Sequence, residues 1–147
     1  MLKKALFFVA VVAMVFSLAS CGSSGSDAEK VFTLRSCSFA LPSSWTDNSA
    51  GDSLMYTAPD DSAGLNVSAD GSENRTALAD RLADVGYDLE TLTVAGDDVR
   101  LFVYQQDGFW FRDFEAERPD AVYHFVYMSE AEDPDGFDQF VQSIKFS

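Results

Sequence analysis

The sequence predicts an α+β domain, a mainly antiparallel sheet of about six or seven strands covered by two helices. Two kinds of pattern support this class. Short runs in which apolar and polar residues alternate are separated by turns rich in Gly, Pro and Asp, which is typical of antiparallel strands. Two other stretches repeat apolar residues every three or four positions, as amphipathic helices do.

The first predicted strands form a hairpin. Val31–Leu34 and Cys37–Leu41 alternate around Arg35-Ser36, and this alternation places Cys37 on the inward face of the second strand. Three further strands follow at Ser53–Thr57, Leu65–Ala69 and Leu89–Val94, with turn residues at Pro59–Gly64 and Ala95–Asp98.

The strongest sheet signal is Asp107-Gly108, a two-residue turn that favours a tight hairpin between Val99–Gln106 and Phe109–Ala116. Counting outward from this turn predicts three cross-strand pairs: Tyr104 with Phe111, Leu101 with Phe114, and Arg100 with Glu115. After a turn at Glu117–Asp120, the run Ala121–Met128 is apolar on both faces, which predicts an interior strand.

Two predicted helices complete the domain. The first has Ser72 as its N-cap, with Glu73 in its first turn, and Gly86 as its stop signal. Its apolar stripe is Leu78, Leu82 and Val85. The second begins at Asp133-Pro134-Asp135, and its stripe is Phe137, Phe140, Val141 and Ile144.

The N-terminal residues have the layout of a secretory signal segment, in which Lys3 and Lys4 precede an apolar run. As a helix of about 15 residues, this run spans only roughly 22 Å, which is too short to cross a hydrocarbon core of about 30 Å. The run ends in Leu18-Ala19-Ser20-Cys21, which resembles the lipobox of bacterial lipoproteins. The resemblance implies cleavage before Cys21 and a diacylglyceryl group on its thiol, an anchor of two chains that holds a protein stably at a membrane. An ordinary signal peptide followed by a chance cysteine is the alternative.

We therefore divide the sequence into a lipoprotein signal peptide (1–20), a flexible Gly/Ser tether (21–29) and an α+β sandwich domain (30–147). The chain is strongly acidic, with 24 Asp and Glu against 10 Lys and Arg and a formal net charge of −14. Nucleic acids and anionic lipid surfaces attract Lys/Arg clusters, so neither is expected as a partner of the domain. Solubility at the cell surface explains the charge, and a cation-binding or basic-partner role is the alternative.

Part of the sequence is similar to a known family. Phe39, Leu41, Pro42 and Trp45 near the start of the domain, together with Phe140 to Phe146 at its end, resemble the PsbP-like α/β/α sandwich over roughly residues 30–147. These matching positions are structural. The resemblance implies a binding or assembly factor, and it supplies no catalytic or ligand-binding residues.

Cys37 and His124 are the candidates for chemistry. We interpret Cys37 as a buried apolar residue and His124, the single histidine, as a hydrogen-bonded structural residue. A dyad of the two would need distant segments to meet and a third group to orient the imidazole. The sequence contains no Gly-x-Ser-x-Gly, His-Glu-x-x-His, phosphate-loop or dinucleotide motif, so we expect a protein that is not an enzyme and has no cofactor.

Acidic residues crowd the segment that leads into the last helix, namely Glu130, Glu132, Asp133, Asp135 and Asp138. Oxygen ligands suit calcium, but the spacing does not follow the twelve-residue calcium loop. Acidic residues are also common at helix starts because of the helix dipole. We predict no metal site and keep a weak calcium site as an alternative.

The candidate binding residues are Tyr104, Phe109, Trp110 and Phe111. Neighbouring side chains of a strand alternate between faces, so three consecutive aromatic residues cannot all point inward unless both faces are covered. If both faces are covered, these residues belong to the core. Otherwise they form an exposed patch for a protein, glycan or peptide.

The function expected from these observations is that of a lipid-anchored extracytoplasmic lipoprotein. Its domain would be a non-catalytic binding or assembly module of the cell envelope, with an envelope protein or glycan as partner. The alternatives are a thiol or hydrolytic enzyme that uses Cys37 and His124, and an acidic surface protein with a weak calcium site.

Overall fold

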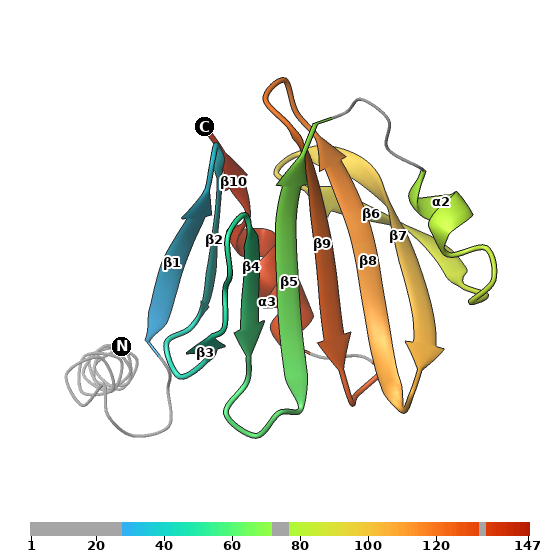
Figure 1. Cartoon of the computed structure of the whole chain (residues 1–147), viewed down its shortest axis with the longest axis horizontal. Helices are drawn as coiled ribbons and strands as arrows, with labels where there is room; N and C mark the ends of the chain where they lie inside the picture. The colour runs from blue at the N-terminus through green and yellow to red at the C-terminus, as the bar shows by residue number, and fades with distance from the viewer. Residues whose placement is uncertain (1–27, 72–76, 133–134) are drawn as a thin grey trace, which may run out of the picture.

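The computed structural model describes residues 28–71, 77–132 and 135–147. The described strands form two antiparallel sheets, one of three strands in the order β1-β2-β10 and one of seven strands in the order β3-β4-β5-β9-β8-β7-β6 (Figure 1). In chain order the elements are β1 (Glu29–Leu34), β2 (Cys37–Pro42), β3 (Thr46–Asp47), β4 (Ser53–Thr57), β5 (Ala63–Asp70), α2 (Leu78–Arg81), β6 (Asp88–Val94), β7 (Asp97–Gln106), β8 (Phe109–Glu117), β9 (Val122–Ser129), α3 (Asp135–Ser143) and β10 (Lys145–Phe146).

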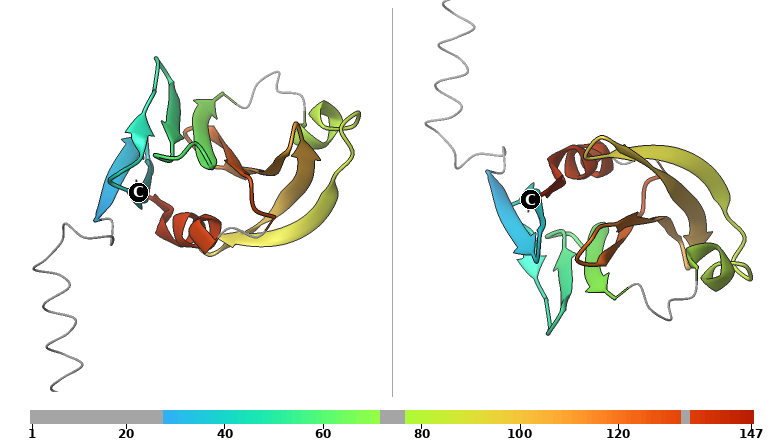
Figure 2. Two further views of the ribbon diagram at one scale, coloured as in Figure 1. Left: turned by 90° about the horizontal axis from the view of Figure 1, so that it is seen from below. Right: turned by 90° about the horizontal axis from the view of Figure 1, so that it is seen from above.

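The predicted α+β class is wrong, because the fold is β-sandwich-like. Strands hold 57% of the described residues and helices 12%. The opening hairpin does not join the large sheet but pairs with β10 to make a sheet of its own. This small sheet and α3 lie together on one side of the large sheet (Figure 2). The sheet that we expected two helices to cover is therefore covered on this face by another sheet and one helix.

The predicted first helix is much shorter than expected. α2 has four residues, and its N-cap residue Ala77 makes no side-chain capping hydrogen bond. The expected cap at Ser72 and Glu73 lies outside the described residues, as do Asp133 and Pro134 before α3. None of the helices in the described ranges is long and apolar enough to cross a membrane.

The strand and turn predictions are largely confirmed. Asp107 and Gly108 both have positive φ, 54° and 84°, as a type I′ hairpin turn requires. As predicted, Tyr104 pairs with Phe111 and Leu101 pairs with Phe114. The paired stretch of β7 and β8 ends at Leu101 and Phe114, so it does not include the predicted pair of Arg100 with Glu115. β9 lies between β5 and β8, so the predicted interior strand is also confirmed.

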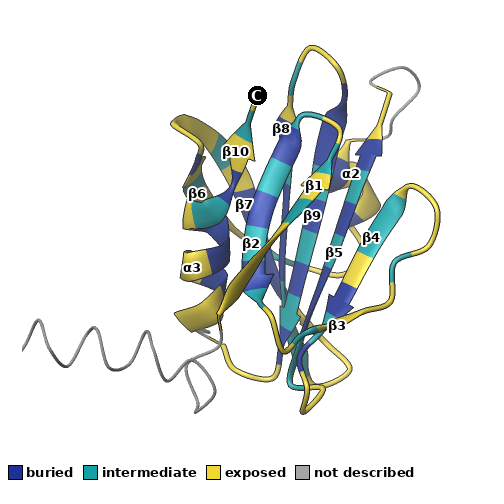
Figure 3. Cartoon of the chain, turned by 90° about the vertical axis from the view of Figure 1, so that its left-hand side faces the viewer, coloured by how far each residue is buried: buried dark blue, intermediate teal, exposed yellow. Residues whose placement is uncertain are grey.

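Aromatic side chains fill the space between the two sheets. Phe114 and Phe125 are fully buried and stacked, with ring centroids 4.8 Å apart. Phe140 of α3 reaches Phe39 of β2 at 5.7 Å and Phe125 at 6.0 Å, so it joins the small sheet to the large one. β1 is mostly exposed, whereas β2 and β9 carry alternating buried positions (Figure 3).

Candidate functional site

The second face of the large sheet, turned away from the small sheet, is covered on one side by the α2 segment (Figure 1). Leu78 and Leu82 of this segment pack on Phe102 and Tyr104 of β7, in a cluster separate from the main core. Phe102 and Tyr104 are two residues apart on β7 and therefore point to the same face. We call this face, opposite the small sheet, the outer face.

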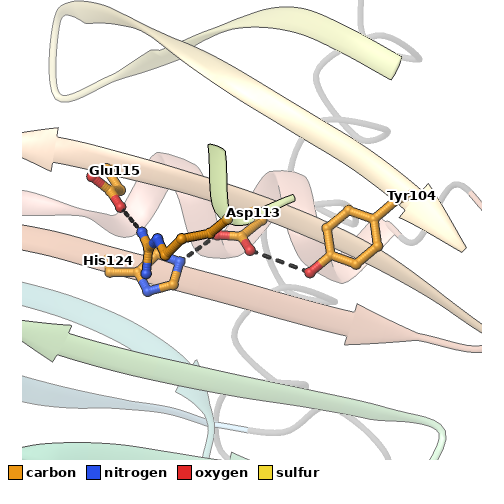
Figure 4. Close-up of polar contacts among 5 residues, drawn as sticks. Tyr104, Asp113, Glu115 and His124 are labelled. Atoms are coloured by element: carbon orange, nitrogen blue, oxygen red, sulfur yellow. Dashed lines mark hydrogen bonds and ion pairs between the residues drawn. The ribbon is translucent and has the colours of Figure 1, made fainter. Parts of the chain in front are cut away.

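A buried polar network lies beneath α2 on the outer face. Asp113 of β8 is 3% exposed, and its carboxylate accepts a hydrogen bond of 3.2 Å from the hydroxyl of Tyr104. The other carboxylate oxygen is bonded to Nε2 of His124, so Asp113 lies between the two side chains (Figure 4). One step along the sheet, Glu115 forms an ion pair with Arg81 of α2. This pair adds a charged contact to the apolar packing of α2 on the sheet.

The network extends the pH range over which the Tyr104 hydroxyl stays protonated. Burial raises the pKa of Tyr104 above its ordinary value of 10.0, and the negative charge of Asp113 raises it further. Tyr104 therefore stays a hydrogen-bond donor beyond the pH at which an exposed tyrosine ionises, and the Asp113 carboxylate is its acceptor. The described contacts of Asp113 and His124 are those of a structural network, as predicted for His124.

Beside the network, the outer face has an apolar hollow of about 220 Å³. Its main lining residues are Met55, Gly64, Asn66, Phe111, Val126 and Met128. Gly64 pairs with Thr57 of β4 and with Met128 of β9, and it has no side chain to fill the space between them. Phe111 joins the hollow to the α2 cluster, because its ring stacks on Tyr104 at 5.1 Å with an interplanar angle of 3°.

The predicted aromatic residues do not form one exposed patch. Tyr104 is buried, and Phe111 is partly buried against it on the outer face. Trp110 points the other way and packs against the main core. Phe109 is half-buried next to the hairpin turn. Of the four candidates, Phe111 lines the hollow, and Cys21 lies outside the described residues.

The structure does not bring Cys37 and His124 together. Cys37 is fully buried in the main core, between the sheets. His124 faces the opposite side of β9 from Tyr123, which belongs to that core. The large sheet therefore separates the thiol from the imidazole.

The acidic segment near the last helix shows no metal geometry where it is described. Asp133 lies outside the described residues. Among the residues that the structure describes, no three His, Cys, Asp or Glu side chains are grouped so that they could hold a metal ion.

Sequence reasoning missed Asp113 and Gly64. Asp113 stands among aromatic residues in the middle of a strand, and a carboxylate at such a position signals a buried partner. Gly64 was assigned to a turn, but β5 already begins at Ala63, which places Gly64 inside the strand. A glycine inside a strand often marks a position at which a ligand or another backbone segment approaches the strand closely.

The fold and this surface define a β-sandwich-like domain whose large sheet is half covered on its outer face. No family model and no curated protein matches the chain. A solved structure from Bacteroides thetaiotaomicron is similar over 84% of this chain, with a TM-score of 0.57 and 12% sequence identity. The chain spans about half, 49%, of the length of that protein. A Pseudomonas aeruginosa protein of unknown function is 20% identical over 69% of this chain and 82% of its own length, with a TM-score of 0.36. The first likeness concerns the fold alone.

Replacing Asp113 tests the network. In Asp113→Ala the Tyr104 hydroxyl and the His124 ring lose their shared partner, and a buried polar group left unpaired costs about 1–3 kcal/mol. We expect the free energy of unfolding in urea to fall by that amount, and by less in Asp113→Asn, whose amide can still bond both side chains. Glu117→Ala, an exposed position on the same strand, is the control, with an expected change within about 0.5 kcal/mol. Equal effects at the two positions would contradict the network.

The Cys37 thiol gives a pH-dependent prediction. Burial raises its pKa from 9.0 to about 12, so between these values the folded chain holds a proton that the unfolded chain has lost. Stability must therefore fall as pH rises through this window, by at most about 1.4 kcal/mol per pH unit. We expect urea unfolding to show a shallower decline above pH 9 for Cys37→Ala than for the unmodified chain. In Cys21→Ser, where Cys37 is the single thiol, the native protein should also resist Ellman's reagent at pH 8 until urea is added, and rapid labelling of this folded variant would contradict the burial of Cys37.

Proposed function

We propose that this chain is a lipid-anchored lipoprotein on the extracytoplasmic face of the membrane, and that its domain is a non-catalytic binding module of the cell envelope. The anchor rests on the Leu18-Ala19-Ser20-Cys21 pattern after a short apolar run. The binding role rests on a single structural observation, the apolar hollow on the outer face between β4 and the α2 cluster.

The hollow supports binding because it is an apolar recess on the surface of an otherwise strongly acidic domain. Apolar concave sites with a few polar groups at the edge are the usual form of a ligand or side-chain pocket. Here Met55 at the mouth is 46% exposed, while Asn66 supplies a polar edge through an amide that donates to the Ser53 hydroxyl at 3.1 Å. Phe111 is the aromatic wall, and aromatic side chains are frequent among the residues that dominate binding energy.

The enzyme alternative receives less support from the geometry. A nucleophile and its base have to lie within hydrogen-bond reach, and the large sheet stands between Cys37 and His124. His124 instead bonds the carboxylate of Asp113 beneath α2. We therefore retain the binding module as the proposal.

The anchor is tested by metabolic labelling with an alkyne fatty acid in a bacterium that processes lipoproteins. The unmodified chain should carry the label and sediment with membranes. Cys21→Ser should lose the label, because the thiol is the acceptor, and Cys37→Ala is the matched control that removes the other cysteine and should keep it. Label retained in Cys21→Ser would contradict the anchor.

The binding surface is tested by photo-crosslinking in intact cells. We expect p-benzoyl-phenylalanine in place of Met55 to give discrete adducts with envelope components. The control is the same group in place of Leu89, which is 54% exposed on β6, away from the hollow. Adducts that are absent at Met55, or identical at both positions, would contradict a binding role for the hollow.

A further inference from the structure

We infer that the hollow binds an apolar anchor side chain from a basic segment of a protein partner, whose Lys or Arg residues meet an acidic rim at one end of the sheet. This inference rests on the proposed binding function and adds the chemistry of the partner.

The hollow is the right size for one anchor side chain. Apolar cavities of about 150 Å³ in proteins can hold a benzene molecule, so about 220 Å³ accommodates a phenylalanine or leucine side chain. A Cβ atom at Gly64 would lie 3.3 Å from the terminal methyl group of Met128 and 3.5 Å from the carbonyl oxygen of Tyr56. Gly64 is itself buried beneath the end of Met128, and the backbone of β5 forms part of the lining of the hollow at this position.

The hollow reaches the acidic end of the sheet. Its row Thr57–Gly64–Met128 immediately precedes the β4–β5 turn and the end of β9. The β4–β5 turn, the β7–β8 turn and the end of β9 lie at the same end of the large sheet (Figure 1). Exposed carboxylates at this end include Asp60, Asp61, Asp107, Glu130 and Glu132.

These carboxylates form a rim that a basic partner would neutralise. The Glu130 amide donates to the Ser62 carbonyl at 3.0 Å, which holds the end of β9 against the β4–β5 turn. Hydrogen bonds from the Ser62 hydroxyl and amide lower the pKa of Asp60, so this carboxylate stays charged near neutral pH. Arg112 also reaches this end of β8, but it is buried, and its guanidinium lies over the Phe137 ring on the inner face.

Charge selects a basic segment over other occupants. A second copy of this chain would bring a domain of the same acidic charge against the rim, because the net charge is −14. A neutral glycan could donate hydrogen bonds to the carboxylates, but it would not neutralise their charge. A lysine- or arginine-rich segment gains both the apolar contact and the attraction of opposite charges, which also speeds association at low salt.

The test uses fluorescein-labelled peptides and the lipidated full chain in phosphatidylcholine nanodiscs, whose surface does not attract lysine. The probe, KKGFGKK, has one phenylalanine between lysines. EEGFGEE reverses the flanking charge, and KKGAGKK removes the anchor. By fluorescence anisotropy we expect the probe to bind at least tenfold more tightly than either control, and to weaken at least threefold between 50 and 500 mM salt. Equal binding of the probe and EEGFGEE would overturn the basic-partner inference.

Variants of the chain locate the binding. Gly64→Val should weaken the probe at least tenfold, because valine suits a strand and occupies the hollow once the flexible end of Met128 moves. Met55→Lys, at an exposed position, should have the same effect by placing a positive charge at the mouth. Unchanged binding in a folded Gly64→Val or Met55→Lys would overturn the site.

The rim is tested by removing its charge without changing its shape. Asp61 has a φ of 59°, a conformation that asparagine also adopts readily, so Asp61→Asn with Glu130→Gln should weaken the probe about threefold. Asp88→Asn with Glu90→Gln on β6 removes the same charge elsewhere and should leave the affinity unchanged. If the Met55 crosslinks form while the lysine probe fails to bind, the binding module stands and the basic partner is wrong.

Discussion

The pairing of β8 with β9 is the constraint on which both the core and the outer surface depend. Phe114 pairs with Phe125, and their stacked rings lie in the core, while Glu115 pairs with His124 on the other face. Because successive side chains alternate, a slip of one residue would turn the Asp113 carboxylate into the apolar core. Burying an unpaired charge there is far more costly than losing a contact, so the register is strongly determined. The same pairing therefore places the aromatic core and the polar network at once.

The outer face depends on tertiary contacts more than on local helix stability. A helix of four residues is far below the roughly 12–15 residues at which isolated helices become even marginal in water, so α2 holds its place through its packing. Its ion pair with Glu115 is partly exposed, and such pairs contribute at most about 1 kcal/mol. Burial of Leu78 and Leu82 stabilises the segment more, by about 1.5–3 kcal/mol for each leucine. The wall of the hollow formed by Phe111 is thus fixed by apolar packing, since its ring stacks on Tyr104 within the α2 cluster.

Local signals in the sequence predicted the parts of the fold that depend on neighbours in the chain. Asp107-Gly108 identified the hairpin and its register because only certain residues accept positive φ at both turn positions. The fold class was missed because it depends on a distant pairing, Cys37 with Phe146, which no local pattern records. For the site, His124 was recognised as a structural residue, but its partner Asp113 and the hollow at Gly64 arise only when four strands align side by side.

Stability alone does not account for the hollow. A glycine inside a strand costs about 0.5–1 kcal/mol relative to alanine, and here it also leaves apolar side chains of the neighbouring strands partly uncovered. The backbone at Gly64 has no positive φ that would require glycine. A Cβ there would meet only the flexible end of Met128 closely, so a larger residue could be accommodated by a small movement. The terminal methyl group of Met128 already packs over Gly64, and in the proposed binding role an apolar group of a partner would cover the neighbouring side chains that remain partly exposed.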